Sequence, residues 1–303
     1  RRGVWHLSRR PVKRLSAAIA LVAIASCRGA ELGPGVPPAL AFDLLRGSHR
    51  SIYRVRSDGS DTLCLTPDSA DNRQPTSAAG TIVFVSSRDG NAELYSMPNQ
   101  GGTATRLTFT TANEADPALS PDGTKLAYTR DDGGLPRLWI GNADASGAVR
   151  VTDSLDFGGA VDASPAWGPA SDKVVFVSTT SGSARLYQLT LAGMTIAPVL
   201  SDTAPDVEPS VSPEGTLLAF VSGANGGARV ATLDVAKHKV NFLTTAGAQN
   251  GQPTWLADSA IVFLQRGATP ALAVINPLAP LTVQLIDVGP GTPGHPAPIR
   301  PND

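Results

Sequence analysis

The sequence predicts an all-β protein made of six similar sheets. A unit of about 44 residues recurs six times between Ala39 and Pro296. Each unit holds short apolar segments separated by turn residues, and none shows the 3.6-residue period of an amphipathic helix. Each unit also divides into four such segments. Four strands per unit at this repeat length are typical of propeller blades, so we expect a six-bladed β-propeller of four-stranded blades.

The composition agrees with a folded, turn-rich chain. Of the 303 residues, 42% are hydrophobic and 17% are charged, with 30 glycines and 25 prolines. The formal net charge is −1, but the first 27 residues hold six basic residues and no acidic one. The remainder carries 19 basic and 26 acidic residues. This acidic body gives no support for nucleic-acid binding, which needs a basic surface.

The N-terminal segment has the pattern of an export signal. Four basic residues between Arg9 and Arg14 precede an apolar run over 15–25, which is too short to span a bilayer but suits a signal-peptide core. The run ends Ile24-Ala25-Ser26-Cys27, which resembles a bacterial lipobox. That resemblance implies a lipoprotein signal peptide over 1–27 and lipidation of Cys27. An ordinary secretory signal with an unrelated cysteine is the alternative.

These features predict the domain organisation. After the signal, residues 28–38 are rich in glycine and proline and suit a tether. Residues 39–303 form the propeller. We expect an exported monomer that contacts the membrane through its N-terminal lipid only, at the periplasmic face of the outer membrane or at the cell surface.

Prolines mark the start of the repeated unit. They are spaced 42, 48, 44, 44 and 43 residues apart, at Pro75, Pro117, Pro165, Pro209, Pro253 and Pro296. A short strand follows most of them and ends in a turn, such as Ser120-Pro121-Asp122-Gly123. Proline fixes φ at the second position of such a turn, so this sequence favours a type I turn before the next strand.

The second and third strands of each unit form a hairpin. The second strand carries an aromatic residue, and the six aromatics are Phe42, Phe84, Tyr128, Phe176, Phe220 and Phe263. In the first four units another aromatic follows eleven residues later, after turn-forming residues such as Ser87-Arg88-Asp89-Gly90-Asn91. We expect these aromatics to pack one blade on the next. The fourth strand should end at a pair such as Leu65-Thr66 or Leu107-Thr108.

The ends of the repeat predict how the ring closes. The first unit begins with its aromatic strand and lacks the short strand before it, whereas Pro296-Ala297-Pro298-Ile299 matches the start of a further unit. The C-terminal segment should therefore supply the inner strand of the first blade and cover an edge that would otherwise be exposed.

The unit resembles the TolB-type repeat of WD-like propellers. The resemblance is carried by Pro117 to Thr129 (Pro-Ala-Leu-Ser-Pro-Asp-Gly-Thr-Lys-Leu-Ala-Tyr-Thr) together with Leu138-Trp139-Ile140, and it extends over most of 39–299. It implies a periplasmic propeller that binds a protein partner. Similar repeats also precede the catalytic domain of prolyl-oligopeptidase-like peptidases.

The sequence contains no recognised catalytic motif. A Gly-x-Ser-x-Gly elbow, a His-Glu-x-x-His pair, a phosphate-binding loop and a cysteine pair for zinc are all missing from it. The four histidines, at positions 6, 49, 238 and 295, are sparse. We therefore assign no catalytic residue and no cofactor.

Stacking the units brings polar residues to equivalent places near the channel. The residue before each repeat proline is Gln74, Asp116, Ser164, Glu208, Gln252 or His295. Two positions earlier stand Asn72, Glu114, Asp162, Asp206, Asn250 and Pro293. We predict a channel-mouth binding site formed by Gln74, Glu114, Asp116, Asp162, Asp206, Glu208, Gln252 and His295.

The carboxylates of this site suggest two kinds of ligand. Oxygen atoms from Asp116, Asp162 and Glu208 could hold Ca²⁺, or the acidic mouth could bind a basic segment of a partner. The alternative is that these are solvated loop carboxylates and turn caps. The favoured function is a non-catalytic, lipid-anchored module of the cell envelope that binds a protein, peptide or glycan. The alternative function is a propeller hydrolase or lyase with a pocket on the channel.

Overall fold

The computed structural model describes residues 38–152, 160–201, 204–224, 227–245, 247, 249–257, 259–279 and 282–299. The predicted signal peptide, Cys27 and nearly all of the predicted tether lie outside these residues. No helix in the described ranges is long and apolar enough to cross a membrane.

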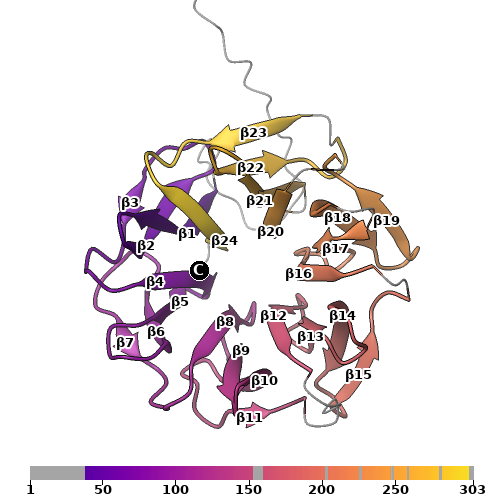
Figure 1. The fold of residues 1–303 in the computed structure, drawn as a ribbon, viewed down its shortest axis with the longest axis horizontal. Helices are drawn as coiled ribbons and strands as arrows, with labels where there is room; N and C mark the ends of the chain where they lie inside the picture. The colour runs from indigo at the N-terminus through magenta and orange to yellow at the C-terminus, as the bar shows by residue number, and fades with distance from the viewer. Residues whose placement is uncertain are drawn as a thin grey trace, which may run out of the picture. The chain divides into compact units, whose positions relative to one another are not determined.

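The described strands form six antiparallel sheets of four strands, arranged as blades around a channel (Figure 1). From the channel outwards, blade 1 consists of β24 (Thr292–Ile299), β1 (Ala39–Arg46), β2 (His49–Arg56) and β3 (Leu63–Cys64). Blade 2 consists of β4 (Asn72–Ala78), β5 (Thr81–Ser86), β6 (Glu93–Pro98) and β7 (Thr105–Arg106). Blade 3 consists of β8 (Glu114–Leu119), β9 (Lys125–Asp132), β10 (Leu135–Asn142) and β11 (Val149–Arg150).

The other three blades repeat this order. Blade 4 consists of β12 (Asp162–Trp167), β13 (Lys173–Ser178), β14 (Arg185–Thr190) and β15 (Thr195–Pro198). Blade 5 consists of β16 (Asp206–Val211), β17 (Leu217–Ser222), β18 (Arg229–Asp234) and β19 (Lys239–Phe242). Blade 6 consists of β20 (Gln249–Ala257), β21 (Ala260–Arg266), β22 (Ala271–Ile275) and β23 (Val283–Ile286). The predicted six-bladed propeller is therefore confirmed.

The C-terminal strand closes the ring, as predicted. β24 pairs antiparallel with β1, with Ile299 opposite Ala39 and Thr292 opposite Leu45. In Figure 1 the yellow β24 lies inside the indigo β1, so the two ends of the propeller share one sheet. β24 thus covers the inner edge of β1, whose unpaired backbone groups would otherwise face the channel.

The aromatic residues of the second strands pack between blades. Phe42, Phe84, Phe176, Phe220 and Phe263 are at most 1% exposed. Phe42 packs with residues of blade 6 such as Val262, whereas Ala41 on the opposite face packs with Phe84 of blade 2. Alternate residues of one strand therefore join the two neighbouring blades. Each buried phenylalanine contributes about 2–3 kcal/mol through the hydrophobic effect.

Threonine side chains end several outer strands earlier than the sequence suggests. β3 stops at Cys64, and Leu65 donates one further backbone hydrogen bond to Ile52. The hydroxyl of Thr66 then accepts the N–H of Ile52 at 2.8 Å. Thr108 does the same for Leu94 and Thr244 for Val230. The leucine–threonine pair therefore lies just after the outer strand and not within it. The threonine side-chain oxygen takes the place of the next backbone acceptor in the hydrogen-bond pattern of the sheet.

Candidate functional site

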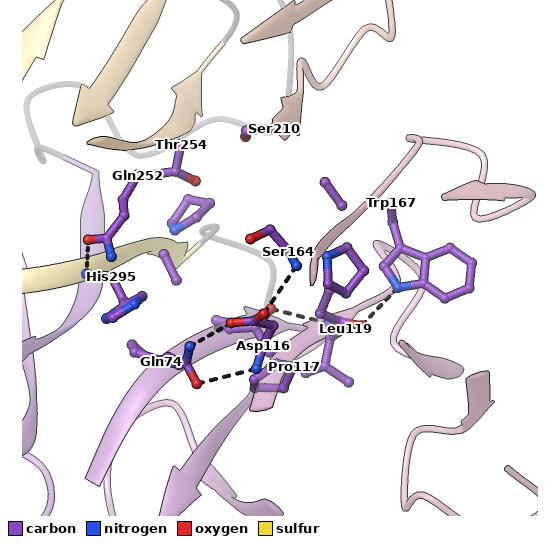
Figure 2. Close-up of a pocket in the computed structure, with 18 of the residues that line it drawn as sticks. Gln74, Asp116, Pro117, Leu119, Ser164, Trp167, Ser210, Gln252, Thr254 and His295 are labelled. Atoms are coloured by element: carbon purple, nitrogen blue, oxygen red, sulfur yellow. Dashed lines mark hydrogen bonds between the residues drawn. The ribbon is translucent and has the colours of Figure 1, made fainter. Parts of the chain in front are cut away.

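The channel contains a cavity of about 460 Å³ that is bordered by all six inner strands. Each strand contributes its repeat proline and the polar residue before it. We call these polar residues the ring residues: Gln74, Asp116, Ser164, Glu208, Gln252 and His295. Figure 2 shows most of them arranged around the open centre, with Gln74, Asp116 and Ser164 on one side and Gln252 and His295 on the other.

All six ring residues have a left-handed backbone. Their φ angles lie between 41° and 54°. This conformation costs a residue other than glycine about 1–2 kcal/mol. The strand pairing shifts register around these positions, for example between Arg73 and Thr76 and between Ala115 and Ala118. A bulge thus redirects the ring side chain toward the channel in every blade.

Hydrogen bonds between blades compensate for this strain. In four junctions a ring side chain accepts the backbone N–H of the next ring residue: Asp116 N–H to Gln74 Oε1 (3.3 Å), Ser164 N–H to Asp116 Oδ2 (3.1 Å), Gln252 N–H to Glu208 Oε2 (2.6 Å) and His295 N–H to Gln252 Oε1 (2.7 Å). We call these contacts ring bonds. The left-handed turn presents the N–H to the neighbouring blade, and the bulge frees it from its own ladder.

The junction between blades 1 and 2 uses a different acceptor. The N–H of Gln74 donates to Oδ1 of Asp43 at 3.3 Å, and Nδ1 of His295 lies 2.6 Å from the same oxygen. Oδ2 of Asp43 accepts from Arg50 at 2.5 Å. Burial alone would raise the pKa of Asp43, but the hydrogen bond from His295 and the attraction of His295 and Arg50 hold it below its usual value.

Sequence reasoning missed Asp43, although the repeat contains a signal for it. The residue after the strand aromatic is Asp43 in the first unit, but Val85, Thr129, Val177, Val221 and Leu264 in the others. A lone carboxylate at a position that is otherwise uncharged marks the place where the C-terminal strand joins the first blade. Gly294 completes this arrangement, because a Cβ there would lie 3.1 Å from Oδ2 of Asp43.

The structure brings five of the eight predicted channel-mouth residues to one cavity and places the other three elsewhere. The structure brings Gln74, Asp116, Glu208, Gln252 and His295 to the cavity. Three other predicted residues do not line it, because they are buried away from the channel: Glu114 (0% exposed), Asp162 (1%) and Asp206 (2%). Regular β structure would place residues two apart on one face, but the left-handed ring residue interrupts that alternation.

The buried carboxylates Asp162 and Glu114 bind groups of the preceding blade. Oδ2 of Asp162 accepts from the hydroxyl of Thr152 at 2.5 Å and from the N–H of Leu138 at 3.3 Å. Asp162 therefore cannot join Asp116 and Glu208 in the predicted calcium site. Nor does the described part of the chain contain any group of three or more His, Cys, Asp or Glu side chains placed to hold a metal ion.

Glu114 forms a buried pair with Glu93, which was also missed. Both side chains are 0% exposed, and Arg106 lies 2.7 Å from Glu93. Thr110 and Thr108 donate to Glu114 at 2.7 and 3.2 Å. Burial, followed by the charge of Glu93, raises the pKa of Glu114 to about 7. Glu114 is therefore expected to change its protonation state near neutral pH.

This raised pKa predicts how stability depends on pH. The unfolded chain loses the Glu114 proton near pH 4.5, whereas the folded chain keeps it up to about pH 7, so stability should fall as the pH rises through this window. Glu114→Gln mimics the protonated acid and should remove this pH dependence. The free energy of unfolding of the native protein should therefore fall more than that of the variant between pH 5 and pH 8, by at most about 3 kcal/mol. Urea unfolding of both proteins at the two pH values measures this effect. Parallel pH profiles would contradict it.

Comparisons with known proteins agree with the repeat and the fold. Residues 12–156 and 117–286 match the model of the TolB β-propeller domain. The TolB homologue of Chlorobaculum tepidum is 35% identical over 112 residues, which cover 37% of this chain and 25% of that protein. The TolB homologue of Chlorobium luteolum is 37% identical, with 36% of this chain and 34% of that protein covered. The matched part thus spans about a quarter to a third of these curated relatives.

Solved structures share the fold at low identity. TolB from Acinetobacter baumannii has a TM-score of 0.76 and 19% identity, covering 88% of this chain and 68% of that one. An oligogalacturonate lyase from Vibrio parahaemolyticus has a TM-score of 0.56 and 14% identity, covering 77% and 73%. These likenesses show a common architecture, which binding proteins and enzymes both use. Because the family model matches most of the sequence, the chain belongs to the TolB β-propeller domain family.

Proposed function

We propose that the chain is a non-catalytic binding module of the bacterial cell envelope, which holds a protein, peptide or glycan at its channel. The observation that carries this proposal is the cavity of about 460 Å³, to which every blade presents one ring residue and one proline. Cavities of roughly 300–1,000 Å³ are usual for specific ligands. An inserted segment of a partner would contact all six blades at once.

The chemistry of the ring favours binding over catalysis. The carboxylates of Asp116 and Glu208 already accept backbone N–H groups of the next blade. A carboxylate held in this way is a poor general base, because protonating it would weaken the ring. The remaining polar atoms and the proline walls suit hydrogen bonding to, and packing against, an extended segment.

The envelope location rests on two supports. The chain belongs to the TolB propeller family, and its Ile24-Ala25-Ser26-Cys27 sequence resembles a lipobox. Acylation of Cys27 would anchor the propeller to a membrane through the intervening Gly/Pro-rich segment, with its channel free to meet a partner.

A hydrolase or lyase with a pocket on the channel is the second candidate. The observation in its favour is the pair of His295 and Asp43, in which a buried carboxylate orients an imidazole at the cavity. However, Asp43 also accepts from Arg50 and Gln74, so the same contacts serve the closure of the ring. This candidate requires turnover that depends on His295, whereas the binding module predicts capture without turnover.

Site-directed photo-cross-linking tests the binding module. Thr254 lines the cavity, and Figure 2 places it beside Gln252. With benzoylphenylalanine at position 254, irradiation in an envelope extract should give one discrete adduct on a denaturing gel. The matched control places the same group at Thr195, an exposed residue of the outer strand β15. Equal adducts from both positions, or none from position 254, would contradict the proposal.

A Cys27→Ser variant serves as the control for the anchor. It should move the protein from the membrane fraction to the soluble fraction. The adduct at position 254 should persist, because the channel does not depend on the lipid. An unchanged membrane fraction would contradict the proposed lipidation and leave the binding result standing.

A further inference from the structure

In the part of the chain that the structure describes, one of the six junctions has no side-chain acceptor for the N–H of its ring residue, whereas four have a ring bond and the fifth uses Asp43. Between blades 4 and 5 the ring residue is Ser164, whose side chain is one bond shorter than that of Asp116. Among the described residues, no side chain accepts the N–H of Glu208, and the hydroxyl of Ser164 has no hydrogen-bond partner. In Figure 2 the Ser164 hydroxyl is directed away from Asp116, toward the open centre. We call this place the Ser164 junction.

The other junctions show which group the Ser164 junction suits. Where ring bonds form, the acceptor is the carboxamide oxygen of Gln74 or Gln252, or the carboxylate oxygen of Asp116 or Glu208. Since the blades are repeats with the same left-handed ring backbone, the N–H of Glu208 is oriented like the N–H groups that are bound elsewhere. It should bind the same kind of oxygen from a ligand.

The charges around the junction distinguish the two kinds of oxygen. Asp116 lies on one side, with its Oδ2 bonded to the N–H of Ser164. The Glu208 side chain lies on the other, and its ion pair with the half-exposed Arg266 is long, at 3.6 Å. A third carboxylate placed between them would be repelled. A neutral amide avoids this cost, and its N–H can donate to the Ser164 hydroxyl.

We propose that the Ser164 junction is a subsite for a neutral carboxamide, the side chain of an asparagine or glutamine of the bound partner. The ligand oxygen takes the place that a ring side chain occupies elsewhere and accepts from the N–H of Glu208. Both Ser164 and Glu208 line the cavity, so a segment inserted there reaches the junction. This inference rests on the proposed binding function and names the group that the channel recognises.

Titration of ¹⁵N-labelled propeller with acetamide tests the subsite. The amide resonance of Glu208 should shift in a saturable manner, with a dissociation constant in the millimolar range, on the order of 10 mM. Acetate, which has the same size but carries a charge, should bind about tenfold more weakly. No shift at Glu208, or a larger shift with acetate, would overturn the proposal.

A Ser164→Asn variant supplies the missing acceptor from within the ring. Asparagine tolerates the left-handed conformation and matches the length of Asp116, which bonds to the next blade. The variant should melt about 2–4 °C higher and bind acetamide about tenfold more weakly. Ser164→Gln, which places the side chain of Gln74 and Gln252 at this junction, is a second variant with the same expected effects. Native-like acetamide binding in a folded variant would refute the subsite.

The two proposals can fail separately. Cross-linking from position 254 depends on a partner entering the channel, whichever group it presents there. An adduct at position 254 without an acetamide shift at Glu208 would leave the binding module standing and remove the amide subsite. An acetamide shift without any adduct would remove the proposed envelope partner.

Discussion

A chain that ends at Gly291 is expected to lose the cooperative unfolding of the complete propeller. The deletion removes β24, the inner strand of blade 1, and with it the buried Ala297 and Ile299 and the ring residue His295. It also exposes the inner edge of β1 and the core residues beneath it. We expect the melting temperature to fall by more than about 10 °C, since several kcal/mol of packing and hydrogen bonding disappear together.

Differential scanning calorimetry measures this effect, and a shorter deletion controls for it. A chain that ends at Ile299 keeps all of β24 and should melt like the full-length protein. A synthetic peptide with the sequence of 292–299, added to the chain that ends at Gly291, should restore part of the loss by strand addition. If the two truncated chains melted alike, β24 would not close the ring in solution.

Asp43→Asn should be the most destabilising single polar substitution. Asp43 is 0% exposed and bonds to Arg50, His295 and the N–H of Gln74. An amide keeps the shape but removes the charge that compensates Arg50. Breaking a buried, hydrogen-bonded ion pair costs about 3–5 kcal/mol, and the partial exposure of Arg50 favours the lower end.

The effect of Asp43→Asn should itself depend on pH. The pKa of Asp43 is lower in the folded protein than in the unfolded chain, because His295 and Arg50 stabilise its charged form. Its stabilising contribution is therefore complete above the pKa of the unfolded chain and is lost as the pH falls through the folded value. The difference between native and variant free energies of unfolding should be large at pH 7 and shrink below about pH 4.

The matched control for this substitution is Asp61→Asn. Asp61 is 44% exposed and lies 3.2 Å from Arg54, so it makes the same kind of ion pair in water. Exposed pairs contribute at most about 1 kcal/mol. Denaturant titrations of both variants provide the comparison. A loss at Asp43 no larger than the loss at Asp61 would show that the buried contacts do not hold the ring together.

The sequence predicted the blades because a propeller repeats its local chemistry. Several features can be interpreted within a single unit. They are the prolines, the strand aromatics such as Phe84 and the C-terminal segment that matches the start of a unit. Contacts between units were harder to foresee. Asp43, for example, is only a carboxylate in an apolar strand when its own unit is considered. Its partner His295 comes from β24, at the other end of the sequence. This contact could be predicted only by comparing equivalent positions of the six units and finding the one charged residue among them.

The three misplaced carboxylates illustrate the same limit within one strand. Glu114 and Asp116 are two residues apart, and regular β structure would direct both side chains the same way. Residues other than glycine adopt a left-handed backbone in only a few per cent of cases, so the presence of Asp116 was not enough to predict the turn there. The sequence did contain one indication of the turn, which is that a polar residue precedes a proline at the same place in all six units. Such a repeated pair indicates that the backbone has the same conformation there in every blade.

The closure of blade 1 by β24 also determines when this blade can be completed during synthesis of the chain. β1 is synthesised before the other described strands, but its inner partner begins only at Thr292, on the order of 250 residues later. At roughly 5–20 residues per second, the inner edge of β1 waits tens of seconds for its neighbour. Throughout that interval a nascent chain presents an apolar, unpaired strand, so the first blade made is the last blade finished.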